Sequence, residues 1–265
     1  MLERYIQAIR TDDPGLEEPA ATRERLKGGF APGAVRRMTQ LGLLVGAAVG
    51  ELAPTEDDTV VHASAFGETR TLAGFLDSFP TAIPTLFQTS VHPSSVQQVL
   101  IGRQCSVREF FPLAGGPYLA GQALLVALLA TTPRVLVCGG EERGAWMAEC
   151  GVASPRGFAF ALALTAEPGA GTLGRLSLTQ ADPVLGLEAR SNEITGGTPV
   201  PLDMAGKRGM GVPPMSEEHC SKAQDRGPTN QAGGLSLADW FDILHGRRPF
   251  AGPAAPGWQL QLEWS

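Results

Sequence analysis

The sequence predicts an α/β fold in which helices pack against a layered, mixed β-sheet. Strand-like segments such as "RVLVCG" alternate with apolar helical segments such as "LLVGAAVG" along much of the chain. Two further strand-like segments, "GFAFALALTAE" and "TLGRLSLTQAD", follow each other across "PGAG" and predict a closing antiparallel hairpin. With 265 residues, 43% of them hydrophobic, the chain can bury a substantial core, and we expect residues 1–265 to form a single domain.

The N-terminal part predicts one strand, one long connection and one buried helix. Residues 5–11, "YIQAIRT", have the pattern of a short strand, and residues 12–33 are rich in Pro, Glu and Gly, which favours an exposed connection. Residues 34–52 predict a helix because their apolar residues recur at helical spacing. The face that these residues form contains Met38, Leu41, Leu44, Val45 and Ala48.

The next segments alternate between strand and helix. Residues 58–66, "DTVVHASAF", predict a strand, and residues 71–79, "TLAGFLDSF", predict a helix. Residues 83–102 predict a further helix that is interrupted at Pro93, where the two serines that follow can cap the restart.

A glycine turn joins a strand near Phe110 to an apolar helix. The helix is expected to begin at Pro117, because a missing N–H costs nothing in the first turn of a helix. Gly115 and Gly116 are expected to let the strand turn tightly into this helix. The strand "RVLVCG" follows, and a helix over residues 235–248 and a strand over residues 258–264 close the chain.

Residues 192–234 differ from the rest in composition. They are crowded with Gly, Pro and polar residues without any period, which predicts a disordered surface loop without chemistry of its own. The loop contains "TGGTPVP" and "GMGVPPM". The codons of the first, read on the opposite strand with a shift of one base, give a sequence similar to the second. We therefore take the loop as a translated inverted repeat, with a plain Pro/Gly linker as the alternative; the gene sequence decides between them.

Composition limits the class of partner. The formal net charge of −6 and the pI near 5.3 disfavour nucleic acid and anionic lipid, so small acyl substrates or protein partners fit better. No apolar run is long enough to span a membrane. The four cysteines form no CxxC pair and the N-terminus lacks a signal-peptide core, which predicts a cytoplasmic protein. We expect no cofactor and no metal.

The order of four segments carries a family resemblance. These segments are "IPTLFQTSVHPSSVQQVLIGR", "FFPLAGGPYLAGQALLVALL", "VLVCGGEE" and "GFAFALAL". Over about residues 30–190 the chain resembles the N-terminal half of a β-ketoacyl synthase of the thiolase superfamily. It is most similar to the ketosynthase-like chain length factors of fatty-acid and aryl-polyene-type polyketide gene clusters. The resemblance implies a thiolase-like half domain.

The resemblance also implies that the nucleophile is missing. In active ketosynthases the turn before the buried helix holds the acyl-accepting cysteine, and this chain has Gly115 at or next to that position. The nearest thiols, Cys105 and Cys138, lie on the preceding segment and in the following strand, where an inert role is expected. The histidines that support decarboxylation belong to a C-terminal half that this chain lacks. The resemblance therefore argues against condensation by this polypeptide alone.

Ser90 and His92 form a second candidate site. Relatives read Ser-Val-His-Asn here, whereas this chain has Pro93 in place of Asn and Val96 in place of a later Gly. A Ser-x-His pair can activate a hydroxyl, but side chains two apart on a helix point in different directions. A core or interface histidine is the competing interpretation.

The remaining motifs have structural interpretations. In "CGGEE" the glycines are expected to let the strand end pass close to neighbouring backbone, and the two glutamates to cap or face solvent, since a P-loop lysine and metal ligands are absent nearby. Arg36 and Arg37 are expected at a solvated helix start, with docking of an acidic carrier protein as the alternative. Four phenylalanines are expected mainly in the core, with two of them, Phe87 and Phe111, as candidates for an acyl pocket or interface; the four are Phe66, Phe87, Phe110 and Phe111.

The predicted function is that of a non-condensing ketosynthase-like subunit in fatty-acid or polyketide synthesis. It would pair with a ketosynthase or with itself and shape or position the acyl chain, with an acyl carrier protein as a further partner. An isolated half should expose an apolar face that needs a partner. Two alternatives remain: an acyltransferase or hydrolase that uses Ser90 or a cysteine, and a degenerate family member with little activity.

Overall fold

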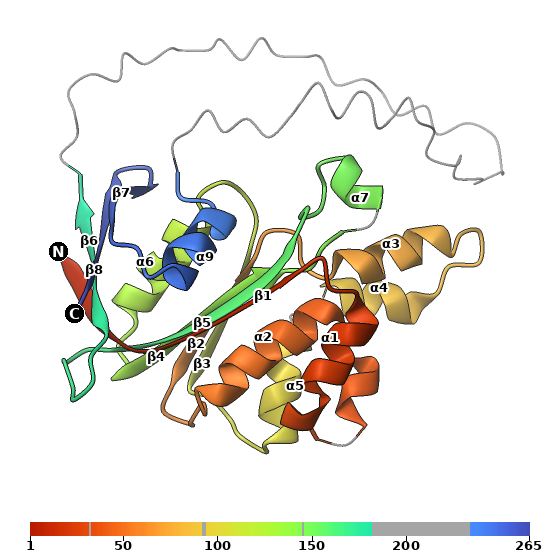
Figure 1. The fold of residues 1–265 in the computed structure, drawn as a ribbon, viewed down its shortest axis with the longest axis horizontal. Helices are drawn as coiled ribbons and strands as arrows, with labels where there is room; N and C mark the ends of the chain where they lie inside the picture. Colours follow the sequence, from red (N-terminus) through yellow and green to blue (C-terminus); the bar gives the residue numbers. More distant parts are fainter. Residues whose placement is uncertain (32, 92–93, 145, 182–233) are drawn as a thin grey trace, which may run out of the picture.

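The computed structural model describes residues 1–31, 33–91, 94–144, 146–181 and 234–265, and it confirms the predicted mixed sheet with packed helices. Eight strands form one sheet in the order β3-β2-β4-β5-β1-β6-β8-β7. The sheet curls strongly, and helices cover both of its faces (Figure 1). Nearly all of the loop predicted over residues 192–234 lies outside the described residues.

The longest strand lies in the middle of the sheet. β1 (Leu2–Gly15) pairs antiparallel with β5 (Gly157–Thr165) on one side and with β6 (Gly174–Gln180) on the other. The predicted hairpin between β5 and β6 is therefore wrong, because β1 separates them. Every residue of β5 except the last is buried, so this strand needs a partner on each edge, and it pairs with β4 on its other side.

The two ends of the sheet differ in strand direction. β2 (Thr59–Ser64) pairs in parallel with β3 (Glu109–Ala114) and with β4 (Arg134–Glu141). At the other end, β8 (Trp258–Trp264) pairs antiparallel with β6 and with β7 (Phe250–Ala255). The sequence does not predict β7, which contains Pro253; a proline is tolerated there because β7 is an edge strand.

One helical layer consists of α1 (Pro19–Leu26), α2 (Gln40–Glu51) and α5 (Ser94–Gly102) (Figure 1). The helix predicted over residues 34–52 is α2 (Gln40–Glu51), whose Thr39 accepts a hydrogen bond from the N–H of Gly42 as an N-cap; a short 3₁₀ turn, Ala34–Arg37, precedes it. All five residues of the predicted apolar face are buried. The helix predicted over residues 83–102 is divided into α4 (Pro84–Val91) and α5 (Ser94–Gly102), as the proline between them implies.

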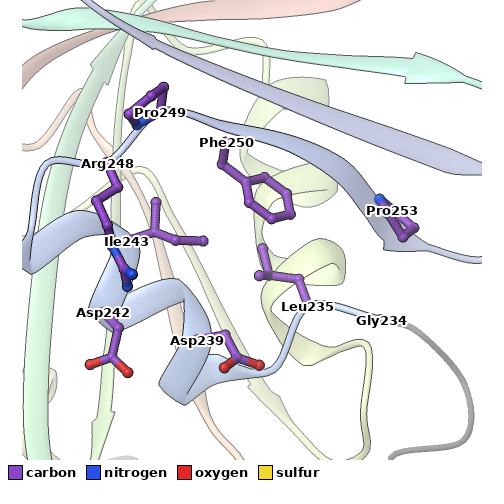
Figure 2. Close-up of a pocket in the computed structure, with 9 residues that line it drawn as sticks. All are labelled: Gly234, Leu235, Asp239, Asp242, Ile243, Arg248, Pro249, Phe250 and Pro253. Atoms are coloured by element: carbon purple, nitrogen blue, oxygen red, sulfur yellow. The ribbon is translucent and has the colours of Figure 1, made fainter.

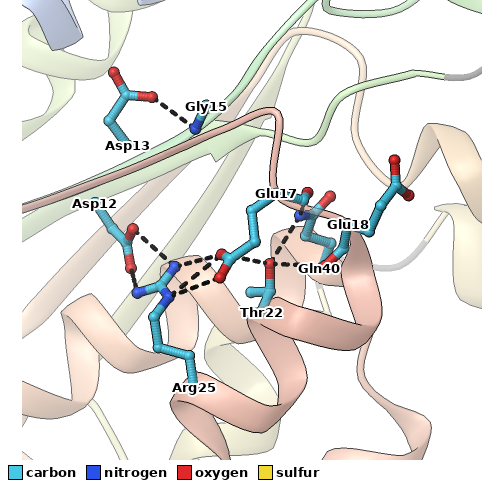
Figure 3. A network of polar contacts seen from close by, with 8 residues as sticks. All are labelled: Asp12, Asp13, Gly15, Glu17, Glu18, Thr22, Arg25 and Gln40. Atoms are coloured by element: carbon cyan, nitrogen blue, oxygen red, sulfur yellow. Dashed lines mark hydrogen bonds and ion pairs between the residues drawn. The ribbon is translucent and has the colours of Figure 1, made fainter.

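The connection predicted over residues 12–33 contains a helix, α1 (Pro19–Leu26), so that prediction is wrong there. Its sequence has no apolar stripe, and polar contacts hold it in place instead. The Arg25 guanidinium contacts the carboxylates of Asp12 at 2.7 Å and Glu17 at 2.9 Å (Figure 3). The Gln40 amide donates to the Glu17 carbonyl and to Thr22 Oγ1 at 2.8 and 2.9 Å. These contacts tie the end of β1 to α1 and α2.

The opposite layer consists of α6 (Leu119–Leu129) and α9 (Leu237–His245). α6 is apolar around most of its circumference, and seven of its residues are buried against the sheet and α9. It also approaches β7 closely: a Cβ at Gly121 would lie 2.2 Å from the Ala254 carbonyl oxygen. β7 therefore packs directly against α6.

Two further helices, α3 (Thr69–Asp77) and α7 (Trp146–Glu149), complete the described part of the fold. α3 follows β2 and packs against α4, and α7 follows β4. None of the helices in the described ranges is long and apolar enough to cross a membrane.

Candidate functional site

A cavity of about 320 Å³ lies at the carboxyl ends of β2 and β3. Such ends are where open α/β sheets commonly bind ligands. The first turn of α2, the turn after β2 and the end of α4 complete its wall. The residues that line it are Leu41, His62, Ser64, Ala65, Phe66, Gly67, Glu68, Ser90, Pro112, Leu113 and Ala114.

The glycine turn lies directly beside this cavity, because Ala114 lines it and Gly115 follows. Gly115 has a φ of +131°, a conformation that residues with a side chain rarely adopt. The helix begins at Leu119 with Tyr118 as its N-cap, so Pro117 precedes the first turn and the expected helix start at Pro117 is wrong. The turn thus keeps the strand-to-helix connection, but its backbone at Gly115 does not suit a nucleophilic side chain.

Neither candidate thiol lies near the turn. Cys138 is buried in β4, and burial raises the pKa of its thiol, as expected of an inert cysteine. Cys105 lies before β3, at the strand end opposite to Gly115, and its thiol donates to the carbonyls of Pro54 and Ser106 at 3.2 and 3.1 Å. Because β3 is six residues long, its two ends, and therefore Cys105 and the glycine turn, lie roughly 20 Å apart.

Ser90 does line the cavity, but its hydroxyl donates to the Phe87 carbonyl within α4 at 2.7 Å. This is the local bond that serines commonly form in helices, and it gives no activation. His92 and Pro93 lie outside the described residues. The structure therefore does not test the predicted Ser90–His92 pair.

Ser64 is a cavity residue that the sequence reasoning missed. It is the last residue of β2 and is 4% exposed. Its hydroxyl donates to Glu141 Oε2 at 3.1 Å and accepts from the Gly67 N–H at 2.9 Å. The signal that could have identified it is the small polar residue at the carboxyl end of a buried parallel strand.

Glu141 holds the turn that forms one wall of the cavity. It is 3% exposed and, besides Ser64, accepts from the N–H groups of Ala65 at 2.5 Å and Phe66 at 3.2 Å. Burial raises the pKa of Glu141 to about 7, although the three hydrogen bonds act in the opposite direction. The expectation that this glutamate faces solvent is wrong.

Glu142 joins the N-termini of two helices. Its carboxylate accepts from the N–H of Leu41 in α2 at 3.5 Å and of Arg70 in α3 at 2.6 Å, so the capping interpretation is confirmed for this residue. Burial raises the pKa of Glu142. The preceding glycines also behave as predicted: Cβ atoms at Gly139 and Gly140 would lie 2.1 and 2.2 Å from carbonyl oxygens of β2 and β5.

His62 lies two residues before Ser64 on β2 and also lines the cavity. Burial lowers the pKa of its imidazole to about 4. The side chain is therefore neutral at physiological pH.

The two groups have opposite effects on stability. Folding raises the pKa of Glu141 from 4.5 to about 7, so its contribution to stability is present below about pH 4.5 and is lost as the pH rises to 7. Folding lowers the pKa of His62 from 6.5 to about 4, so its contribution is present above about pH 6.5 and is lost as the pH falls to 4. Between about pH 4.5 and 6.5 the two effects oppose each other.

Single substitutions should separate these effects. Relative to the parent protein, the slope of unfolding free energy against pH should become more positive by about 1.4 kcal/mol per pH unit in Glu141→Gln and more negative by a similar amount in His62→Asn. Urea unfolding between pH 4.5 and 6.5 measures both slopes. Glu142 is present in all three proteins, so its own contribution to the slope is the same in each. Equal slopes in the three proteins would show that folding does not shift the pKa values of Glu141 and His62 as described.

The phenylalanines are not mainly in the core. Phe66, Phe87 and Phe111 are 42%, 49% and 39% exposed, so the core expectation is wrong for these three. Phe110 is partly buried and packs against the core cluster that α2 forms with buried residues of α5 and of the strands beneath it. Phe66 lines the cavity, whereas Phe87 and Phe111 do not.

A second pocket of about 550 Å³ lies between α9 and β7 (Figure 2). Its two aspartates already have partners: Asp242 forms an ion pair with Arg156 at 2.7 Å, and Asp239 accepts from the Ser236 hydroxyl at 2.6 Å.

The described residues contain no cluster of His, Cys, Asp and Glu that could hold a metal ion. Arg36 is exposed as expected, but it lies in the 3₁₀ turn that precedes α2 and not at the start of the helix.

Comparison with solved structures identifies the fold. The chain aligns with one chain of the ketosynthase ApeO in complex with its chain length factor ApeC from Xenorhabdus doucetiae, over 99% of this chain and 100% of that chain, with 18% identity and a TM-score of 0.55. It also aligns with the ishigamide ketosynthase/chain length factor (17% identity, 68% of each chain, TM-score 0.48). A third match is a β-ketoacyl synthase from Burkholderia phymatum STM815 (12% identity, 68% of this chain and 65% of that chain, TM-score 0.49). No family model and no curated protein matches the chain. The predicted thiolase-like fold is confirmed.

Proposed function

We propose that this chain is a non-condensing ketosynthase-like subunit of fatty-acid or polyketide synthesis in the cytoplasm. One observation carries the proposal: the strand-to-helix turn lies beside a cavity and contains Gly115, whose φ of +131° residues with a side chain rarely adopt. The family resemblance implies that the acyl-accepting cysteine of active ketosynthases lies at or next to this position. The similar solved structure supports this role, because it is a complex of a ketosynthase with its chain length factor, and its matched chain is covered along its full length.

The sheet edge at β3 is the surface that we assign to a partner. Among the strands in the described ranges, β2 is the one partner of β3, and Phe111 of β3 is exposed. Unpaired sheet edges commonly accept a partner strand, and the other edge strand, β7, lies at the opposite end of the sheet. Phe87 of α4 is also exposed and contacts Phe75 with ring centroids 5.2 Å apart. We define the outer edge of β3 with Phe111, together with the exposed Phe87 of α4, as the pairing edge.

Apolar side chains are expected to carry most of the pairing energy. Pro112 lies in the middle of β3 and has no N–H, so a continuous backbone ladder with a partner strand is interrupted there. Ser90 of α4 and Pro112 of β3 both line the cavity, which therefore lies beside the pairing edge. A partner bound at this edge would place its acyl chain near the cavity, where this subunit can limit or position it. An acyl carrier protein is the further partner that this role requires.

The lack of a nucleophile is tested by acylation. After incubation with an acyl thioester, intact-protein mass spectrometry should show no stable adduct on this chain, because the turn has no reactive side chain and the Ser90 hydroxyl is engaged in a helix. A ketosynthase treated in the same way is the positive control. An adduct that Ser90→Ala or Cys105→Ala abolishes would instead establish the acyltransferase or hydrolase alternative.

A further inference from the structure

The cavity contains a hydroxyl whose hydrogen is held by a neighbouring carboxylate. Ser64 Oγ donates to Glu141 Oε2 at 3.1 Å and accepts from the Gly67 N–H at 2.9 Å. A hydroxyl has one hydrogen and two lone pairs. While Glu141 is ionised, Ser64 can therefore offer only its second lone pair to a ligand in the cavity.

Protonation of Glu141 changes this arrangement. The carboxyl O–H then needs an acceptor, and two of the three groups that contact Glu141 are the backbone N–H groups of Ala65 and Phe66, which can only donate. Ser64 Oγ is the contact that can reverse its role and accept. It would then accept from both Gly67 and Glu141, and its own hydrogen would become available to the cavity that it lines.

Glu141 is the carboxylate that is hydrogen-bonded to this hydroxyl. The pKa of Glu141 is raised to about 7, and that of His62, which lines the same cavity, is lowered to about 4. Arg70 donates from its Nε to the Arg143 carbonyl at 2.9 Å. The ionisable groups of the neighbouring elements are His62 on β2, Glu68 after β2, Arg70 on α3, and Glu142 and Arg143 after β4.

We propose that Ser64 binds a carbonyl oxygen of the acyl chain and that protonation of Glu141 switches this hydrogen-bond donor on. The inference rests on the proposed function, because the cavity is the one assigned there to the acyl chain. It adds a ligand class: a chain that carries a ketone is preferred over a saturated chain of the same shape. No bond is made or broken, and the only proton taken up is the one on Glu141.

The test uses the full chain and two probes of the same shape. The probes are 2-octanone labelled with ¹³C at its carbonyl and 2-methyl-1-octene, which replaces the carbonyl oxygen by a methylene group. The ketone should bind about fivefold more tightly at pH 6 than at pH 8, as expected for one additional hydrogen bond. Its infrared carbonyl band should shift to lower frequency at pH 6. Binding of the alkene should not depend on pH.

Two variants separate the hydrogen bond from a structural effect. Ser64→Ala should retain alkene binding, which shows an intact cavity, but lose the carbonyl shift and the pH dependence. Glu141→Gln should bind the ketone tightly at both pH values, because its amide can donate to Ser64 permanently. A ketone affinity independent of pH in the parent protein, failure of the ketone to bind, or a carbonyl shift retained in Ser64→Ala would overturn the inference. The molecular mass of the same samples reports pairing separately, so failure of this site and failure of the proposed function are distinguishable.

Discussion

Gly139→Ala is expected to destabilise the protein by about 3 kcal/mol or more. An added Cβ would lie 2.1 Å from the carbonyl oxygen of Ala63, which is the residue paired with Gly139 across the β2–β4 ladder. Because both strands are buried in the middle of the sheet, neither can move away without breaking hydrogen bonds. Displacement of β2 would also displace Ser64 and therefore the cavity wall.

Urea unfolding followed by circular dichroism measures this effect. Gly28→Ala is the matched control, because its added Cβ meets no atom within 4 Å. The control should change the free energy of unfolding by less than about 1 kcal/mol. Similar losses in the two variants would show that β2 and β4 do not approach each other as closely as the structure places them.

Negative charges at the pairing edge are expected to raise the dissociation constant of the complex, with a ketosynthase or with a second copy of this chain, by about 100-fold. The double variant Phe87→Asp with Phe111→Asp removes two exposed aromatic rings and introduces two carboxylates that would have to be buried against the partner. Analytical ultracentrifugation over a concentration series measures the dissociation constant. Thermal unfolding of the isolated variant checks that loss of the Phe75–Phe87 contact has not unfolded α4.

Leu16→Asp is the control for the pairing edge. Leu16 is 74% exposed and follows β1, which β2, β4 and β5 separate from β3. This substitution should leave the dissociation constant within about twofold of the parent value. If the double variant associates as strongly as the parent protein, the partner does not bind at this edge.

The sequence predicted most elements whose hydrophobic period is strong, but not how distant segments pair. α2 and β8 were found because apolar residues recur at the spacing of a helix and a strand. The hairpin prediction failed because short separation favoured β5 with β6, whereas β1, far away in sequence, lies between them. α1 was missed because ion pairs rather than an apolar stripe hold it.

The candidate site was predicted in part. The turn at Gly115 and the close backbone approach at Gly139 could be inferred, because glycine has few other reasons to occupy such positions. Ser64 and Glu141 could not be paired from sequence, since 77 positions separate them and only the parallel arrangement of β2 and β4 brings them together. For Phe87 and Phe111 the sequence left a core position and a pocket or interface position open, because an aromatic residue at an interface has the same sequence pattern as one in a core.

The molecular mass in solution tests the central claim most directly. Light scattering should be measured on the purified chain at micromolar concentrations, alone and mixed with a ketosynthase encoded beside its gene. A subunit that pairs through its exposed edge should have the mass of a homodimer alone or of a heterodimer in the mixture. A stable, monodisperse monomer under both conditions would contradict the proposed role.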